Sequence, residues 1–521
     1  MDYSSIKKGL ESFVERYDSQ TFIGSYRETG RSSLLNDGLS TRANSLWKMA
    51  EYVVAKYDGK TTPLSNYING WKQLAAGAAN QYLLLEESNN DWGMYDSQGV
   101  RLGGEEYIKE YFSRQAKKID HLGHFVSQTP TIEIQNKFRP YITAIKSKPF
   151  LLLAGISGTG KSRIVRELAK ACWDKNSKEY QDPRPRNFEM VQVKPNWHDS
   201  SELIGYVSRI DGVRYVVGPF LRFMVKAIQD PETPYFLCLD EMNLAPVEQY
   251  FAEYLSVVES RKRQDDGTIT TDPIVDYSDT EEYQSLIYQL FRDDDDLRKA
   301  FLTEEGGKRL SIPSNLIVIG TVNMDETTFS FSRKVLDRAM TIEMNEVDLK
   351  GGLESHHENI GKLGAAELIG TAVEGVDVYG DYKDVCDKAI NYLQKVNDKL
   401  EGTPFKIAYR TRNEALLYVV NNLPYNKDEK GKELSQEYII ARALDEITNM
   451  KILSRIEGDE TKVSKDFLEG LEKEIREGLE AVCEDIFGDG ALFGEAYSSV
   501  SLSKLDEMKK RLGSGYTSFW S

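Results

Sequence analysis

The sequence predicts an α/β fold with a parallel sheet, followed by a C-terminal helical region and preceded by a mixed, mainly helical N-terminal segment. Two observations support this prediction. Between residues 150 and 320, short apolar runs alternate with helical stretches, and this alternation is typical of a parallel sheet covered by helices. Beyond about residue 350, apolar residues recur at helical spacing among many charged ones.

Length and composition indicate several folded domains in one chain. The 521 residues exceed one ordinary domain of about 100–200 residues. Aromatic residues make up 11% of the chain, which is enough to build packed cores. We therefore divide the chain into an N-terminal domain (1–130), an α/β core (131–350) and a C-terminal helical region (351–521).

Charge and hydropathy exclude several classes of protein. The net charge of −17 argues against a chain that coats nucleic acid along its whole length. Residues 1–150 sum to about +2, so any DNA contact is expected in the N-terminal third. No apolar run approaches the ~20 residues of a membrane span, and the first residues lack a secretion signal. We expect a cytoplasmic protein without a membrane contact. The four cysteines lack CxxC spacing, which favours neither a disulfide scaffold nor a zinc site.

Four apolar runs predict the strands of the sheet. They cover residues 150–154, 190–193, 235–239 and 316–320, and unbroken apolar runs are typical of strands buried on both faces. An acidic insertion at about 265–305 separates the third run from the fourth. We expect this insertion to be a solvated surface excursion.

A phosphate-binding loop follows the first predicted strand and precedes a helical stretch from Arg163 to Cys172. It fits the pattern GxxxxGK[ST]. In such a loop, backbone N–H groups wrap a phosphate and the next helix directs its positive end at the charge. Lys161 is expected to reach the β- and γ-phosphates, and Ser162 to bind Mg²⁺. The predicted nucleotide-binding residues of the loop are Gly155, Ile156, Ser157, Gly158, Thr159, Gly160, Lys161 and Ser162.

Two acids follow the third apolar run. Asp240 is expected to join Ser162 in the metal shell, and Glu241 to polarise the attacking water, which are the roles of such a pair in phosphoryl transfer. Two acids that open a surface loop are the alternative. The phosphate loop in the same chain favours the catalytic interpretation.

Polar and basic residues follow the fourth predicted strand. Asn323 is the candidate for orienting the hydrolytic water, because it lies at the tip of a strand beside the acidic one. Arg333 and Arg338 lie at helical spacing with Lys334 and Asp337. An arginine at a subunit edge can stabilise charge on a neighbour's nucleotide. Both arginines are therefore catalytic candidates, and a solvated helix face is the alternative.

The order of these motifs resembles the AAA+ ATPase superfamily. Gly320–Thr328 and Phe331–Ala339 resemble its McrB-like branch, which supplies the NTPase motors of modification-dependent restriction systems. Glu202–Tyr206 followed by Gly218–Phe220 is similar to the inserted helix-2 region that this branch shares with MoxR-like and dynein-related modules.

The resemblance continues beyond the α/β core and covers roughly residues 138–460. Phe405–Glu414 resembles the second sensor of the helical lid, which implies that Arg410 binds nucleotide. Lys451–Gly458 is similar to a further segment of the branch.

The resemblance implies a P-loop nucleoside triphosphatase that uses ATP or GTP with Mg²⁺. It also implies a homo-oligomeric ring, expected to be a hexamer, a separately encoded McrC-like nuclease, DNA binding through the N-terminal domain and a role in antiviral defence. The best-known member of the branch has Asn-Thr-Ala-Asp-Arg where this chain has Asn323–Thr327. That member uses GTP, so the departure leaves the choice of base open.

Two other functions stay open at this point. A MoxR-like ATPase would remodel protein complexes, and a binding module would hold nucleotide without hydrolysing it. Glu241 argues against the binding module, because an inactive site needs no base. His121 and His124 have metal-like spacing but no third ligand nearby, so ordinary surface or core histidines are favoured. An aromatic core is likewise favoured over a base-stacking surface for Trp47, Trp71 and Trp92.

Overall fold

The computed structural model describes residues 81–86, 91–96, 101–103, 136–210, 212–265, 267–276, 278–303, 309–324, 331–345, 360–428, 431–487 and 497–520. The chain divides into two compact units, residues 1–131 with 265–267, and residues 132–264 with 268–521. In the first unit the described residues form an antiparallel sheet of β1 (Gln81–Glu86), β2 (Asp91–Asp96) and β3 (Arg101–Gly103). The rest of the expected recognition domain, with the histidine pair and the tryptophan side chains, lies outside the described residues.

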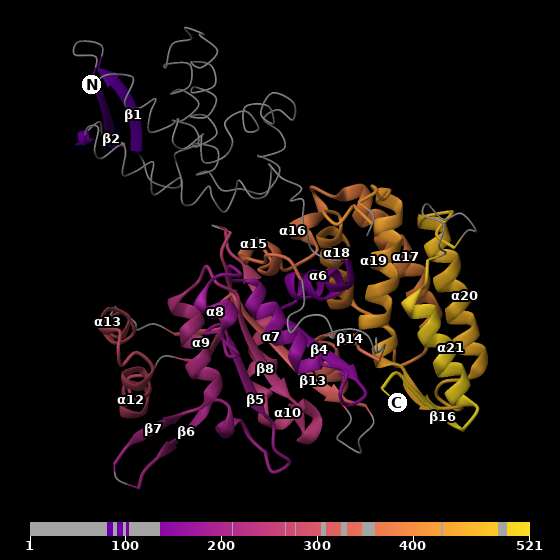
Figure 1. Cartoon of the computed structure of the whole chain (residues 1–521), viewed down its shortest axis with the longest axis horizontal. Coiled ribbons are helices and arrows are strands. Elements are labelled where there is room, and N and C mark those ends of the chain that lie inside the picture. Colours follow the sequence, from indigo (N-terminus) through magenta and orange to yellow (C-terminus); the bar gives the residue numbers. More distant parts are fainter. Residues whose placement is uncertain are drawn as a thin grey trace. The chain divides into compact units, whose positions relative to one another are not determined.

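The second unit contains a five-stranded parallel sheet, as the sequence predicts (Figure 1). Its order is β14 (Met340–Glu343), β4 (Phe150–Gly155), β13 (Leu316–Asn323), β8 (Tyr235–Asp240) and β5 (Phe188–Gln192). Four of these strands match the predicted apolar runs. The edge strand β14 was not predicted, because its four residues directly follow a basic stretch with helical spacing and form too short an apolar run.

The sheet is buried on both faces, as expected for a strand pattern without alternation. Every residue of β4 and β13 is buried. Leu151 and Leu153 join the hydrophobic core on one face, and Phe150, Leu152 and Ala154 join the core on the other. The first core includes α7 (Lys161–Ala171) and the second includes α9 (Pro219–Gln229). The α/β fold is therefore confirmed.

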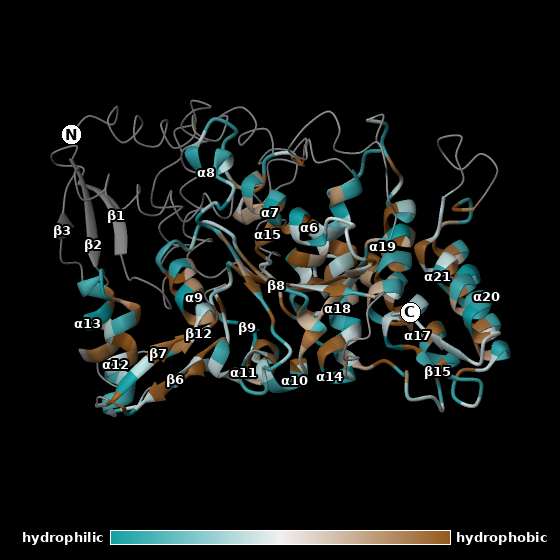
Figure 2. Cartoon of the chain, turned by 60° about the horizontal axis from the view of Figure 1, so that its bottom comes forward, coloured by the Kyte–Doolittle hydropathy of each residue, from teal (hydrophilic) through white to brown (hydrophobic). Residues whose placement is uncertain are grey.

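The acidic insertion is more than the solvated excursion that its charge suggested. It forms α12 (Glu281–Leu290) and α13 (Asp295–Thr303), which carry both hydrophobic and hydrophilic residues (Figure 2). Tyr283, Leu286 and Ile287 of α12 are buried in the second core. The expectation was wrong because the acids occupy the exposed side of helices whose other side is apolar.

Helices dominate the C-terminal part of the second unit, as the helical spacing of apolar residues beyond about residue 350 predicts. The long ones are α17 (Lys383–Lys399), α18 (Tyr409–Asn422), α19 (Gln436–Lys451), α20 (Lys465–Val482) and α21 (Val500–Leu512). None of the helices in the described ranges has the length and apolarity of a membrane-spanning segment. The remaining elements are α6 (Arg139–Ser147), α8 (Lys178–Gln181), α10 (Val247–Tyr250), α11 (Ala252–Val257), α14 (Arg333–Leu336), α15 (Ala365–Leu368), α16 (Val376–Tyr379), β6 (Gly205–Ser208), β7 (Arg214–Val217), β9 (Lys262–Arg263), β10 (Ile269–Thr270), β11 (Pro273–Val275), β12 (Leu310–Ser311), β15 (Glu457–Asp459) and β16 (Tyr516–Ser518).

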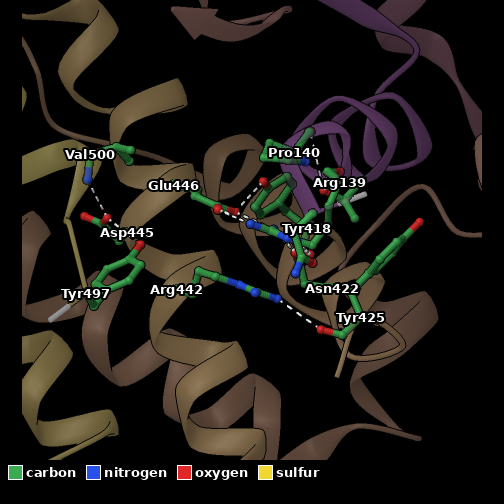
Figure 3. Close-up of polar contacts among 12 residues, drawn as sticks. Arg139, Pro140, Tyr418, Asn422, Tyr425, Arg442, Asp445, Glu446, Tyr497 and Val500 are labelled. Carbon is green, nitrogen blue, oxygen red and sulfur yellow. Dashed lines mark hydrogen bonds and ion pairs between the residues drawn. The ribbon is translucent and has the colours of Figure 1, made fainter. Parts of the chain in front are cut away.

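Buried polar contacts join α6 to the helical region (Figure 3). The guanidinium of Arg139 donates to Glu446 on α19, with one N–O distance of 2.8 Å, and the Tyr418 hydroxyl donates to the same carboxylate at 2.7 Å. Asp445, the neighbouring residue, accepts from Tyr497 at 2.8 Å and from the backbone N–H of Val500 at 2.9 Å. The contact of Arg139 fixes the helical region to the segment that leads into β4, and those of Asp445 fix the start of α21 to α19.

Candidate functional site

The phosphate loop leaves the carboxyl end of β4 and turns into α7. Gly158 and Gly160 both have φ of +83°, a left-handed conformation that glycine adopts without strain. At Gly155, a Cβ atom would lie 2.5 Å from the carbonyl oxygen of Met344, so only glycine fits there. The ammonium of Lys161 donates to the carbonyls of Gly155 at 2.9 Å and Ile156 at 2.7 Å. The loop thus has the backbone that a phosphate cradle requires.

The tip of β8 brings a carboxylate to the start of α7. The hydroxyl of Ser162 donates to Oδ1 of Asp240, and the hydroxyl of Thr321 on β13 donates to the same oxygen at 2.8 Å. Sequence reasoning identified Ser162 and Asp240 but not Thr321. A hydroxyl two residues before Asn323, in an otherwise apolar strand, was the signal that could have revealed it.

Glu241 is held in an unusual conformation next to Asp240. Its φ of +54° makes it the sole non-glycine residue with positive φ in the described part of the chain. Such a conformation costs about 1–2 kcal/mol for a residue with a Cβ. Its N–H donates to the hydroxyl of Thr321 at 2.9 Å, and its carboxylate accepts from the amide of Asn323 at 3.1 Å. The turn therefore aims the Glu241 side chain at the tip of β13.

The sheet register places these residues at one edge. Asn323 is the register partner of Gly155, and the N–H of Met324 donates to the Gly155 carbonyl at 3.1 Å. Leu239 of β8, one residue before Asp240, is the register partner of Gly320 of β13. The carboxyl ends of β4, β13 and β8 therefore bring together the loop, the amide and the two acids.

Asn345 is a loop contact that the sequence did not reveal. Its Oδ1 accepts from the N–H of Ile156 at 3.0 Å, and its amide donates to Glu343. Glu343 in turn pairs with Lys504 of α21 at 2.7 Å. Asn345 was missed because it follows β14, the strand that was not predicted.

Arg333 and Arg338 lie on or just after the short helix α14, and neither contacts the phosphate loop. The guanidinium of Arg333 donates to the Pro404 carbonyl at 3.0 Å and lies 5.4 Å from the centre of the Phe405 ring. Arg338 donates to the Lys334 carbonyl at 2.6 Å, and its Nε is buried without a hydrogen-bond partner among the described residues.

The structure does not bring Arg410 to the phosphate loop of its own chain. Arg410 pairs with Glu259, which also pairs with Lys148 at 2.9 Å. Lys148 lies just before β4, whereas the loop lies just after it. Six residues of strand span roughly 20 Å, so Arg410 is near the amino end of the strand and far from the loop.

The residues at the carboxyl edge fit a magnesium ion bound together with nucleotide. Ser162 and Asp240 offer a hydroxyl and a carboxylate in mutual contact at the start of a helix. Mg²⁺ prefers such oxygen ligands and usually binds through one or two of them plus phosphates and water. Within the described ranges no cluster of three or more His, Cys, Asp or Glu side chains could hold a metal. A single hydroxyl and a single carboxylate suit a metal whose remaining ligands are phosphate and water oxygens.

Residues 150–281 match the family "AAA domain (dynein-related subfamily)". This region is an AAA domain. The AAA domain contains the phosphate loop and both acids, whereas Asn323 and the arginines lie beyond it. Residues 369–515 match a "Domain of unknown function (DUF8727)", and this range contains α17 to α21.

A curated relative supports the McrB-like branch. The chain is 24% identical over 208 residues to the "Type IV methyl-directed restriction enzyme EcoKMcrB subunit" of Escherichia coli (strain K12). The match covers 40% of this chain and 37% of the relative, so the chain spans little more than a third of that protein. A proposed ATPase from Cytophaga hutchinsonii is similar to 70% of this chain and 98% of its own, at 16% identity and a TM-score of 0.32. The AAA domain and the McrB relative confirm the resemblance that the sequence predicted. The chain thus carries an AAA domain at residues 150–281 and is similar to the McrB subunit over 208 residues.

Proposed function

We propose that this chain is the motor subunit of a DNA restriction or defence system, which hydrolyses ATP or GTP at the carboxyl edge of its sheet. The observation that supports hydrolysis is the contact of Glu241 with Asn323 beside the pair of Ser162 and Asp240. In this proposal, Lys161 binds the β- and γ-phosphates. Ser162 and Asp240 would hold Mg²⁺, which would supply positive charge to neutralise the phosphates. Glu241 removes a proton from the attacking water, and Asn323 orients the carboxylate and the water.

The proposed assembly is a homo-oligomeric ring, with a hexamer as the expected form. Arg333 and Arg338 do not contact the loop of their own chain, which supports a role at a neighbour's nucleotide. The charges of Arg333 and Arg410 both act on Arg455 of the lid, so these side chains share one region. We therefore place the role of Arg410 at the neighbour's nucleotide as well, rather than at its own.

A role in restriction is supported by the name of the relative. We propose that a separately encoded McrC-like nuclease is the partner, and that residues 1–130 bind DNA. This division into an N-terminal recognition domain, a core (131–350) and a lid with a helical C-terminal region (351–521) is part of the proposal. Because the relative is matched over 37% of its length, its partners and target need direct tests on this chain.

The test is hydrolysis of ATP and of GTP by the purified full-length chain with Mg²⁺, measured alone, with duplex DNA of varied modification, and with the product of a neighbouring nuclease gene. If the chain acts in restriction, DNA should raise the rate of nucleotide hydrolysis several-fold, and the nuclease should copurify with the chain. Stimulation by protein alone, with no response to any DNA, would contradict this proposal and favour the MoxR-like alternative.

A further inference from the structure

Lys451, the last residue of α19, is buried in a place where a lysine is costly. Its side chain is 0% exposed, and an unpaired ammonium is rarely tolerated in a protein interior. The catalytic roles proposed above make no use of it. Its partners show what it does.

The ammonium of Lys451 bonds to the backbone around Arg338. It donates to the carbonyl of Asp337 at 2.9 Å and to that of Ala339 at 2.9 Å, the residues on either side of Arg338. The Leu336 carbonyl lies slightly farther away, at 3.3 Å. The carbonyl of Leu336 ends α14 and that of Asp337 caps it, and the last carbonyls of so short a helix need partners from outside. A cation at that end also interacts favourably with the helix dipole.

The third short contact of Lys451 joins it to the lid and to the base of β4. Its Nζ lies 2.7 Å from Glu414 Oε2 on α18, and the other oxygen of Glu414 lies 3.0 Å from Nζ of Lys148. An ammonium has three protons, so Glu414, Asp337 and Ala339 can use all of them. Burial alone would raise the pKa of Glu414, but the ammonium groups of Lys451 and Lys148 hold it below its ordinary value.

We infer that Lys451 is a positioning residue, which fixes the backbone on both sides of Arg338 so that this arginine is presented to the nucleotide of a neighbouring chain. The inference rests on the shared site proposed above. In this inference the helical region, which matches a domain of unknown function, helps a neighbouring chain to hydrolyse its nucleotide. Burial lowers the pKa of Lys451, Glu414 opposes that shift, and the contact of Glu414 with Lys148 ties Lys451 to the base of the strand that precedes the phosphate loop.

The test uses chains that lack opposite halves of the shared site. A Lys161→Ala chain keeps the arginines and lacks a working loop, and we name it the donor. An Arg333→Ala/Arg338→Ala chain keeps the loop and lacks both arginines, and we name it the acceptor. Each is expected to be inactive alone, and their mixture is expected to regain part of the hydrolysis. Lys451→Met is then placed in one of the two chains at a time.

The inference predicts an effect that depends on the chain. Lys451→Met in the donor should lower the regained activity by about tenfold or more, within the range that such arginines contribute. Lys451→Met in the acceptor should leave the regained hydrolysis within about twofold of that of the unchanged mixture, because the acceptor supplies no arginine. Nucleotide affinity of the acceptor and thermal unfolding of each chain are measured in parallel.

Lys504→Met is the matched control. Lys504 is also buried, with a 2% exposed side chain, and pairs with Glu343 at 2.7 Å. Its ion-pair partners, Glu343 and Glu507, lie outside α14. The control should therefore show no loss that is confined to the donor.

Two variants keep the outcome clear. If the Lys451→Met chain does not fold, the double variant Lys451→Met/Glu414→Gln is used instead in each mixture. It removes the charges of both Lys451 and Glu414 at nearly constant side-chain volume. Equal losses in donor and acceptor, a loss in the acceptor alone, or no loss would overturn the positioning role. An unmodified donor–acceptor mixture without activity would instead overturn the shared site, and the role of Lys451 with it.

Discussion

At the scale of single residues, the site is built on the backbone as much as on side chains. Glu241 reaches Asn323 from a left-handed conformation, and the hydroxyl of Thr321 supports both acids of β8. Sequence motifs identified the acids and the amide because phosphoryl transfer needs those chemical groups. They did not identify Thr321 or Asn345, whose contacts depend on which strands are neighbours.

Asn345→Ala should weaken nucleotide binding by about fivefold, since one hydrogen bond contributes about 1 kcal/mol. The substitution removes the acceptor that holds the N–H of Ile156 at the start of the loop. Titration of the Mg²⁺–nucleotide complex by equilibrium binding measures the change. Asn421→Ala, whose amide bonds to Ser147 away from the loop, is the matched control. An unchanged affinity in Asn345→Ala would show that the contact does not shape the loop.

At the scale of helices and strands, apolar periodicity predicted the elements well where they are long. The predicted runs for β4, β8 and β13 were found, and so was a helical region beyond about residue 350, because these burial patterns extend over many residues. The short elements β14 and α14 depend on contacts that are distant in sequence, such as that of Lys451 with the end of α14. Periodicity alone could not show them.

The ion pair of Arg139 and Glu446 should stabilise the helical region in a pH-dependent way (Figure 3). Burial alone would raise the pKa of Glu446, but Arg139 above all holds it below the ordinary value of 4.5. Its contribution is therefore present above pH 4.5 and is lost as the pH falls through the lowered pKa. At pH 7, Glu446→Gln should cost roughly 3–5 kcal/mol, because it leaves a buried guanidinium without its carboxylate.

Urea unfolding of the parent chain and Glu446→Gln, at pH 7 and at pH 3, measures this contribution. The difference in unfolding free energy between the two chains should shrink in acid, because the Glu446 carboxylate of the unfolded parent chain takes up a proton at a higher pH than the folded one, whose pKa is lowered. A difference that is equal at both pH values would contradict the assignment of charge to Glu446.

At the scale of the whole molecule, hydrolysis and recognition are assigned to different parts of the chain. Every proposed catalytic residue lies in the second unit, residues 132–264 and 268–521. The McrB relative, matched over 40% of this chain, leaves the recognition role of the first unit as a proposal. Sequence composition could not settle that role, since a local charge near zero fits many partners.

Deletion of residues 1–130 should leave basal hydrolysis within about twofold of the full chain, because the phosphate loop, acids and arginines all remain. Binding to duplex DNA, measured by fluorescence anisotropy at fixed salt, should disappear with the deletion. A truncated chain that binds DNA as tightly as the full one would place recognition elsewhere.

The most direct test of hydrolysis at this sheet edge is to measure turnover and nucleotide affinity on the same preparation of Glu241→Gln. The substitution removes the proposed base and leaves Lys161, Ser162 and Asp240 in place. The account predicts that Mg²⁺–nucleotide binds within about threefold of the parent affinity, while turnover falls by about 10²-fold or more. Turnover equal to that of the parent chain would contradict it, because Glu241 could then not be the base.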